Sequence, residues 1–442
     1  MTSLMMAIAQ LNPVNQLCTG CGICVSESGG SLKMDWDEHG FLIPHIAVKT
    51  VSTDVLKVCP FNPNPEDAVQ NEDKLAEIFL AAAPKYEPLV GKYTDTYIGY
   101  SKDFRDSSSS GGIATYVLYE LLKRKLVEHL FIVVGEGSTF KYRVFSDPEE
   151  IKKISKTRYY PVTMEALFVE LEKTEGRIAV SGVACFIKAL RLKQYYYPDL
   201  KMRIPFMLGI ICGGLKSRFF TEFLAQSSGI RSGYIDQEYR IKDPHGTASD
   251  YSFGATDSNG VRHQMKMSKV GDMWGSGLFK AEACDYCTDV LTELADISVG
   301  DAWLPGYRND GRGNSVVITR SHLAENIIRT GIENGDLVLD QVASHKIVDS
   351  QKSSFAHRQD AAQFRNWVAR IRRIAGPPTR TRILRSISFP YAIVQLQRLI
   401  TREKSLSYWK DKADVASFNK RIAKHLAILN GIQKLYHILR SR

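Results

Sequence analysis

Four cysteines near the N-terminus constrain the fold of this chain more than any other feature of its sequence. Cys18, Cys21 and Cys24 form the pattern C-x2-C-x2-C, and Cys59 follows directly before Pro60. Three thiolates at this pitch can wrap one face of an iron-sulfur cube, and a distant Cys-Pro closes it. A structural zinc site is the alternative, although zinc motifs usually pair two C-x2-C knuckles. The spacing predicts a first 4Fe-4S cluster on these four cysteines.

The other four of the eight cysteines lie next to predicted strands. Cys185 follows RIAVSG, Cys212 ends IPFMLGIIC, and Cys284 with Cys287 forms a C-x2-C just before ADISVG. Ligands gather outside the carboxyl ends of strands in an open parallel sheet, which is where the first two would lie. The four thiols can therefore converge on a second site. Buried single cysteines are also common core residues, and this alternative stays open.

Alternating β-rich and helical runs predict an α/β fold with α+β insertions. Residues 1–84 are loop-rich and predict a small ferredoxin-type 4Fe-4S domain. In residues 85–343, the runs TYIGYS, HLFIVVG, GRIAVSG, IPFMLGIIC, ADISVG and NSVVIT alternate with helical stretches, which predicts a largely parallel sheet. Residues 233–280 break this rhythm, so we expect an antiparallel insertion there that covers a site. Residues 344–442 predict a basic helical extension.

Composition favours a globular cytoplasmic protein of two or three units. The chain has 442 residues, of which 44% are hydrophobic and 24% charged. No apolar run approaches the roughly 20 residues that span a bilayer, and the opening MTSLMMAIAQLNP lacks the regions of a signal peptide. Eight cysteines are too few for a secreted disulfide scaffold of this length, so they indicate metal ligands or catalytic thiols.

The charge of the chain is unevenly distributed. The net charge is +10, but residues 344–442 hold 21 lysines and arginines against five acidic residues. A basic tail on a mildly acidic body suggests an anionic partner: lipid headgroups, nucleic acid or an acidic protein. A solvated helical extension is the alternative. Apolar residues among the cations of SISFPYAIVQLQRLI favour an anionic surface at the inner face of a membrane, and nucleic acid is the less favoured partner.

A serine- and glycine-rich turn precedes the amphipathic run IATYVLYELL. Ser110 can cap the helix, Gly111 and Gly112 allow a ligand to approach the backbone, and Ile113 and Thr115 begin the helix. Free amides and the helix dipole at such a turn suit the pyrophosphate of a dinucleotide. A capped helix without a ligand is the alternative.

A second candidate segment for this ligand is KTRYYP. Lys156, Thr157, Arg158 and Tyr159 form a cation-aromatic cluster that can hold phosphate and stack on a ring. A surface turn would have the same composition.

The order of five segments resembles the coenzyme F420 hydrogenase/dehydrogenase beta-subunit family over about residues 15 to 330: SSGGIATYVLYELL, KTRYY, SGVACFIKALR, LGIICGG and CDYCTDVLTELADISVGDAW. The most specific segment runs from Cys284 to Asp301. The chain resembles the longer form with an N-terminal ferredoxin-type motif, which includes 7-hydroxymethyl chlorophyll a reductase. It departs from the pattern at Ala184 and Phe186, where the family commonly has Pro and Gln.

The resemblance implies two 4Fe-4S clusters and FAD. It implies the second cluster on Cys185, Cys212, Cys284 and Cys287. FAD would bind at the turn from Ser110 to Thr115 and near Lys156, Thr157, Arg158 and Tyr159. The candidates for a general acid are Asp301 and Asp296, with Tyr159 and His245 behind them.

These cofactors imply an electron relay. A ferredoxin-like donor or partner subunit would exchange electrons at the first cluster, and FAD would exchange hydride with an organic substrate. The substrate stays open between a deazaflavin and an intermediate of glycan or polysaccharide biosynthesis. A different class also stays open: a non-catalytic iron-sulfur protein with structural or sensory clusters and a tail that binds nucleic acid or a partner.

Overall fold

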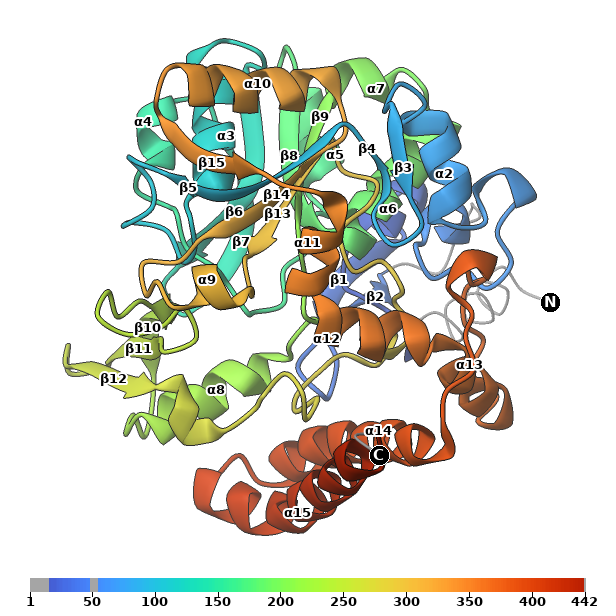
Figure 1. Ribbon diagram of the computed structural model, residues 1–442, viewed down its shortest axis with the longest axis vertical. Helices are drawn as coiled ribbons and strands as arrows, with labels where there is room; N and C mark the ends of the chain where they lie inside the picture. The colour runs from blue at the N-terminus through green and yellow to red at the C-terminus, as the bar shows by residue number, and fades with distance from the viewer. Residues whose placement is uncertain (1–15, 48–54, 441–442) are drawn as a thin grey trace.

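The computed structural model describes residues 16–47 and 55–440, so the opening segment considered as a signal peptide lies outside the described residues. An eight-stranded mixed sheet forms its centre (Figure 1). In sheet order, its strands are β15 (Leu337–Gln341), β5 (Asp95–Ser101), β14 (Ser315–Thr319), β13 (Ile297–Asp301), β9 (Phe206–Ile210), β8 (Ile178–Val183), β6 (His129–Glu136) and β7 (Thr139–Phe145). Each β-rich run predicted for the central region forms one of these strands, which confirms an α/β fold.

The prediction of a largely parallel sheet is wrong. The pairs β13–β9, β9–β8 and β8–β6 are parallel, whereas β15–β5, β5–β14, β14–β13 and β6–β7 are antiparallel. The β6–β7 hairpin shows the physical reason. Glu136 pairs with Thr139, so only Gly137 and Ser138 join the two strands. A parallel pair needs a crossover of a dozen residues or more.

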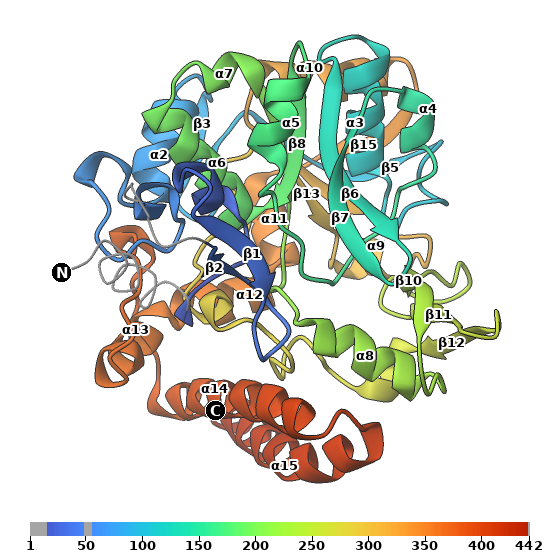
Figure 2. The same cartoon turned by 180° about the vertical axis from the view of Figure 1, so that it is seen from behind.

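Helices cover both faces of the sheet, so the body has three layers (Figures 1 and 2). Alternate residues of β6 serve the two faces, as the period of two in a strand requires. Leu130 packs with α3 and α10, while Phe131 packs with α5 and α6. The helices of the body are α2 (Glu72–Phe79), α3 (Ile113–Lys123), α4 (Pro148–Ile151), α5 (Leu167–Lys173), α6 (Ala184–Tyr196), α7 (Leu200–Arg203), α8 (Arg218–Ser227), α9 (Pro305–Arg308) and α10 (His322–Glu333).

The N-terminal region shares its core with the body. It contains two small antiparallel pairs: β1 (Leu32–Trp36) with β2 (Leu42–Ile46), and β3 (Lys85–Glu87) with β4 (Gly91–Tyr93). Ile23 and Leu75 belong to the same buried cluster as Phe131 and Leu190. Residue 84 therefore marks no break in the hydrophobic core.

The predicted antiparallel insertion is present. It consists of β10 (Tyr234–Ile241), β11 (Ser252–Asp257) and β12 (Arg262–Lys266). Phe253 of β11 and Phe223 of α8 share a buried cluster with Trp409 and Phe418 of the C-terminal extension. The insertion and the extension therefore support each other.

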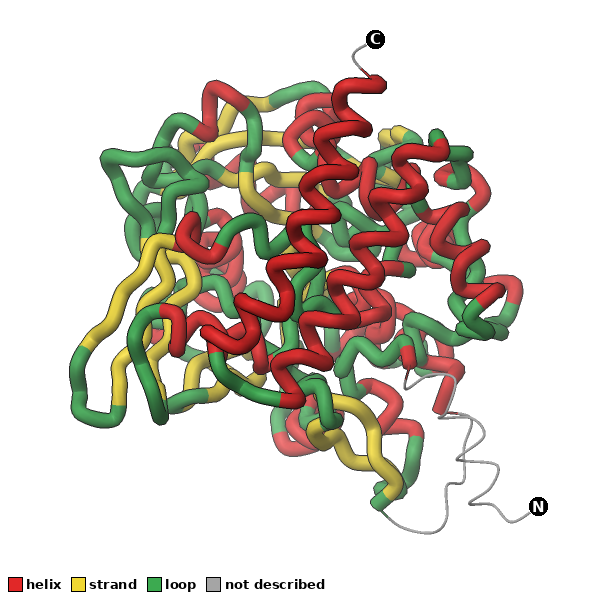
Figure 3. The backbone as a smooth tube through the Cα atoms, turned by 90° about the horizontal axis from the view of Figure 1, so that it is seen from below, coloured by secondary structure: helices red, strands yellow, loops and turns green. Residues whose placement is uncertain are grey.

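The region from residue 344 onward is mainly helical in the described residues. Its helices are α11 (Ser344–Ser350), α12 (Lys352–Phe355), α13 (Ala362–Ile371), α14 (Phe389–Asp411) and α15 (Val415–Arg440), and a π-helical turn, η6 (Ala356–Asp360), lies between α12 and α13. Helices α14 and α15 lie side by side across one side of the molecule (Figure 3). Within the described part of the chain, no helix is both long and apolar enough to cross a membrane.

Many cations of the extension face inward, which the charge count did not indicate. Arg365, Arg380 and Arg402 are among its buried side chains. Arg402 Nε lies 2.8 Å from an oxygen of Asp285, in the body of the chain. The body is therefore itself an anionic partner of the basic extension.

Candidate metal centres and nucleotide site

The N-terminal cysteines line one hollow. Cys18 and Cys21 lie on the loop before a 3-10 helix, η1 (Ile23–Glu27), Cys24 lies within that helix, and Cys59 follows the short helix from Val55 to Val58. Gly20 and Gly22 have φ values of 74° and 76°, a region that glycine adopts at no steric cost. The amide of Gly20 donates to Cys18 Sγ at 3.3 Å. The structure thus brings together all four predicted ligands, from segments 35 residues apart.

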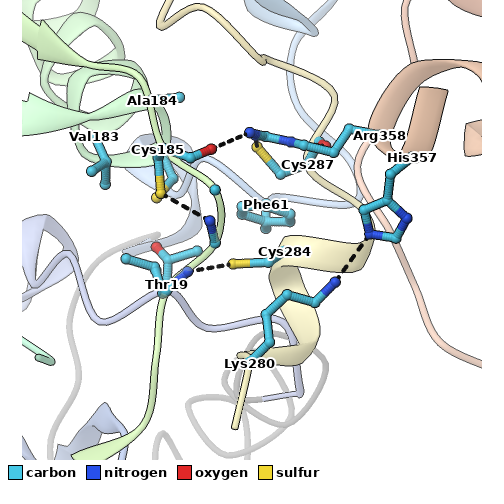
Figure 4. Close-up of a pocket in the computed structure, with 14 residues that line it drawn as sticks. Thr19, Phe61, Val183, Ala184, Cys185, Lys280, Cys284, Cys287, His357 and Arg358 are labelled. Carbon is cyan, nitrogen blue, oxygen red and sulfur yellow. Dashed lines mark hydrogen bonds between the residues drawn. The ribbon is translucent and has the colours of Figure 1, made fainter. Parts of the chain in front are cut away.

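The other four cysteines line a second hollow (Figure 4). Cys185 lies in the first turn of α6, Cys212 follows β9, and Cys284 and Cys287 lie on the segment before β13. Backbone amides point at this set, because Gly214 N donates to Cys212 Sγ at 3.3 Å and Leu215 N donates to Cys284 Sγ at 3.1 Å. The second predicted set therefore also converges.

Four thiols line each hollow, and four thiolates are the ligand set of a 4Fe-4S cluster. Among the described residues, no three His, Cys, Asp or Glu side chains converge closely enough to hold one metal ion. Each cysteine set surrounds a space, and an iron-sulfur cube of the kind that four thiolates ligate can fill it. Burial raises the pKa of Cys59 and of Cys284 to about 12, so these ligand thiolates need positive charge in the hollow. The donor set therefore fits a 4Fe-4S cluster in each hollow.

The two hollows are neighbours. Thr19 and Phe61 line both of them. Cys59 from one set and Cys185 and Cys287 from the other pack against the same small apolar cluster, which contains Phe61. Sequence reasoning missed this role for Thr19 and Phe61, and their positions beside Cys18 and Pro60 are the one signal that could have found it.

The two segments predicted to hold the nucleotide are joined by hydrogen bonds. Ser109 Oγ accepts a hydrogen bond from Thr157 N at 2.9 Å. The hydroxyls of Ser108, Thr115 and Ser155 form a buried cluster between the same segments. Helix α3 begins after Gly112, and no side chain of the described residues caps it there. The uncapped N-terminus of α3 therefore lies beside the Lys156–Tyr159 segment.

Cations gather at this turn. Lys242 Nζ, from the insertion, donates to Ser110 O at 3.0 Å and to Arg312 O at 2.7 Å. Arg158 donates to Ile154 O at 2.7 Å and forms no ion pair with any acidic residue that the structure describes, while burial lowers its pKa to about 10. Lys156 pairs with Glu238 at 3.0 Å. The turn thus carries positive charge that its own carboxylates do not balance, which suits a pyrophosphate. Sequence reasoning missed Lys242, because it lies far along the chain in the insertion.

The two glycines of the turn serve the packing of the chain. A Cβ atom on Gly111 would lie 2.5 Å from Gly99 O, and one on Gly112 would lie 2.6 Å from the carbonyl carbon of Phe104. We expected these glycines to make room for a ligand, but the packing of neighbouring chain segments already requires glycine at both positions. The glycines alone therefore do not identify a nucleotide site. Ile113 is fully buried in the core.

The candidate acids lie in different places. Asp301 ends β13, and its Oδ2 lies 2.5 Å from Arg240 Nη1, so an ion pair occupies this carboxylate. Asp296 lies at the other end of β13, where it accepts hydrogen bonds from Arg191 at 3.0 Å and Met207 N at 2.9 Å. These contacts give Asp296 a structural role and do not favour it as a general acid.

Tyr159 lies close to Arg240 and Asp301. Burial raises the pKa of Tyr159 above its usual value, and the Arg240 guanidinium opposes this rise. Its ring packs at 4.8 Å from Trp274 and 5.5 Å from Tyr239. The hydroxyl of Tyr159 is thus protonated, and its ring packs among aromatic side chains. His245 lies on an exposed turn.

The two departures from the family pattern lie at the start of α6. Ala184 lines the second hollow, whereas Phe186 is buried in the core and stacks on Tyr142 at 6.5 Å. Phe186 therefore lines neither hollow. Cys185 lines the second hollow with the other three cysteines of its set.

Two family models match the chain, and together they span more than half of it. Both describe the beta subunit of coenzyme F420 hydrogenase/dehydrogenase: its N-terminal part matches residues 96–168, and its C-terminal part matches residues 175–345. Among curated proteins, the coenzyme F420 hydrogenase subunit beta of Methanosarcina barkeri is 24% identical over 300 residues, covering 60% of this chain and 93% of that protein. The coenzyme F420-dependent sulfite reductase of Methanocaldococcus jannaschii is 22% identical over 325 residues, covering 70% of this chain and 45% of its own length.

A solved structure, the xenon-derivatized F420-reducing NiFe hydrogenase complex from Methanosarcina barkeri, matches with a TM-score of 0.45 and 21% identity, covering 62% of this chain and 95% of that one. The family models include Cys185, Cys212, Cys284, Cys287 and the turn at Gly112, and they leave out the N-terminal cysteines and most of the extension. The chain belongs to the coenzyme F420 hydrogenase/dehydrogenase beta-subunit family, as its sequence motifs indicated.

Proposed function

We propose that this chain is an iron-sulfur flavoprotein oxidoreductase. It transfers electrons between a ferredoxin-like donor or partner subunit and an organic hydride acceptor or donor. The observation that carries the proposal is the pair of four-cysteine hollows that share Thr19 and Phe61 as lining residues. Two iron-sulfur clusters in adjoining hollows would let electrons pass from one to the other.

The residues that would hold the cofactors follow from the geometry. Cys18, Cys21, Cys24 and Cys59 would ligate one 4Fe-4S cluster, and Cys185, Cys212, Cys284 and Cys287 would ligate the other. The α3 N-terminus, with Lys156, Arg158 and Lys242, would neutralise the pyrophosphate of FAD. A bound flavin supplies the conversion between hydride and single electrons.

Tyr159 and Arg240 are the side chains best placed to act on a substrate. The rings of Tyr239 and Trp274 meet the ring of Tyr159 edge to face, and burial keeps the Tyr159 hydroxyl protonated at neutral pH. Arg240 pairs with Asp301 and stacks on Tyr251 at 4.8 Å. We assign Tyr159 the role of proton donor and Arg240 with Asp301 the role of orienting the substrate.

The substrate class that the relatives favour is a deazaflavin. The family description and both curated relatives carry coenzyme F420 in their names. A deazaflavin accepts or donates hydride, which matches the hydride exchange proposed for FAD. No observation favours a glycan intermediate. One relative is a hydrogenase subunit by name, which supports a partner subunit as the electron donor.

The outer surface of the extension supports contact with an anionic membrane. Phe389 is 77% exposed, and Leu435 and Ile438 are 55% and 53% exposed. Tyr391 stacks on Tyr436 at 4.9 Å, which brings the start of α14 beside the end of α15, so these apolar side chains lie at one end of the hairpin. Helix α15 contains lysines and arginines but no acidic residue. Exposed apolar residues among cations are typical of helices that lie on anionic lipid.

Sedimentation of the full chain with vesicles tests this surface. We expect binding to vesicles that contain phosphatidylglycerol and none to phosphatidylcholine alone, with loss of binding in Leu435→Glu/Ile438→Glu. The exposed Val261→Glu, in the insertion, is the control. If the double variant sediments as the wild type does, the membrane proposal fails. Binding of an acidic protein in place of vesicles would also reject it.

Anaerobic purification with iron, sulfide and flavin quantitation on one sample tests the main proposal. We expect about eight irons and one FAD per chain, with bleaching by dithionite that air reverses. About four irons would mean that one cysteine set is not a cluster site. Iron without flavin, together with salt-dependent binding of DNA or RNA, would favour the non-catalytic alternative instead.

A further inference from the structure

The C-terminal extension contributes a side chain to the second cysteine set. Arg358 lies in the π-helical turn η6, beyond the last residue of the family match at 345. Its Nη2 lies 2.6 Å from Cys287 Sγ (Figure 4). This arginine is thus in direct contact with a proposed cluster ligand that lies 71 residues away in the sequence.

The remaining contacts of Arg358 hold it in place. Its Nη1 donates to Cys212 O at 2.6 Å, its Nε to Cys287 O at 3.2 Å, and its Nη2 also to Asp289 O at 2.6 Å. All these acceptors are neutral carbonyls, and no carboxylate within the described residues forms an ion pair with Arg358. Its positive charge is therefore not balanced by an acidic side chain. The thiolates of the second set, followed by the nearby carboxylate of Asp289, are the negative charge that it faces.

The chain around Arg358 is built to keep this contact. Gln359 donates a hydrogen bond to Thr288 O at 3.0 Å, and Arg365 donates one to the carbonyl of Asp285. Neighbouring residues of the extension therefore hold the loop that carries Cys284 and Cys287. Arg358 is buried, with 6% of its surface exposed. A π-helical turn is rare and is found most often at functional sites. Here it lets successive residues, Arg358 and Gln359, both face the cysteine loop.

We propose that Arg358 is a positioning residue that sets the reduction potential of the second cluster through Cys287. This inference rests on the proposed function. A hydrogen bond from a guanidinium to a ligand sulfur withdraws electron density, and a nearby positive charge stabilises the more negative, reduced form. Arg358 therefore makes the second cluster easier to reduce. A residue of the extension, which lies almost entirely outside the family match, would therefore help to set the reduction potential of this cluster.

A spectroscopic redox titration of the purified holoprotein tests the inference. Arg358→Met and Arg358→Gln remove the charge, and Arg358→Lys keeps it. We expect the midpoint of the second cluster to move to more negative potential in the Met and Gln variants and to return partly toward the wild-type value in Arg358→Lys. The midpoint of the first cluster should stay unchanged. Arg370→Met, at an exposed arginine of α13, controls for the loss of one charge and should shift neither midpoint.

The possible results separate the inference from the proposed function. A wild-type protein without the second set of irons would refute the proposed function. A loaded wild type with an unchanged midpoint in a loaded Arg358→Met would refute the inference alone. If the Met variant loses the second set of irons, the midpoint of Arg358→Gln decides: a negative shift supports the inference, and the wild-type value overturns it.

Discussion

Arg380 of the C-terminal extension is fully buried, and its Nη1 lies 2.7 Å from Oε1 of Glu293. Arg382 approaches the other oxygen of the same carboxylate at 2.6 Å. Arg380 also donates to Thr288 O at 2.9 Å, in the segment that follows Cys287. The extension therefore neutralises a buried carboxylate close to the second cysteine set. Its excess of positive charge is in part a structural complement to the acidic body.

Replacing Arg380 should destabilise the fold. Arg380→Met leaves Glu293 buried with Arg382 as its remaining close partner. Breaking a buried pair in this way costs about 3–5 kcal/mol, and we expect the lower end because Arg382 remains. Anaerobic urea unfolding measures the loss. The control is Arg385→Met, whose side chain is 54% exposed and which should change the free energy of unfolding by less than about 0.5 kcal/mol. Equal stability of the two variants would contradict a structural role for the buried pair.

Single cysteine replacements should separate the two metal centres. Cys21→Ser removes a ligand of the first set, and Cys284→Ser removes one of the second. Because the two hollows have separate ligands, we expect each variant to lose about four irons and to keep FAD. Iron and flavin analysis of the same preparation measures both. Loss of all iron and of FAD from either variant would contradict separate sites.

The strands and the ligands were predictable because their signals are local. The spacing of Cys18, Cys21 and Cys24 fixes their neighbourhood within one turn of chain, and the core strands carry continuous apolar runs such as Ser315–Thr319, which is buried throughout. The edge strands β7 and β15 were missed because half of their residues are exposed, which weakens the apolar pattern. The two-residue turn at Gly137 is the kind of signal that would have corrected the parallel assignment.

The contacts that complete the site were not predictable. Arg358 contacts Cys287 of the second cysteine set from 71 residues further along the chain. Lys242 contacts Ser110 of the glycine turn from 132 residues further along. Nothing in the local sequence distinguishes them from solvated cations. The charge of the extension was countable, but its pairing with Glu293 depends on the tertiary fold. Gly111 and Gly112 lie in the predicted turn, but the reason for glycine there differs from the predicted one. Gly99 and Phe104, from neighbouring segments of the fold, leave no space for a Cβ atom at these two positions.

Removal of one cation from the turn should reduce the FAD content. Arg158→Met removes a half-buried guanidinium that forms no ion pair with an acidic side chain among the described residues and that a pyrophosphate would neutralise. We expect protein with clearly less FAD than the wild type and the same iron content. Lys152→Met is the matched control, because Lys152 lies six residues earlier, pairs with Glu149 at 2.8 Å and is exposed. Wild-type flavin content in Arg158→Met would mean that the nucleotide binds elsewhere.

The affinity for FAD should depend on pH through Lys242. Burial and the Arg105 guanidinium lower the pKa of Lys242 to about 8. A bound pyrophosphate raises this pKa, so FAD binding takes up a proton above pH 8. By linkage, the affinity is fully present below pH 8 and weakens as the pH rises through 8, by up to about tenfold per pH unit for one proton. Fluorescence of released FAD from the diluted holoprotein between pH 7 and pH 9 measures this. Lys242→Arg keeps its charge over that range and should show a flatter profile, so identical slopes in the two proteins would place the titrating group elsewhere.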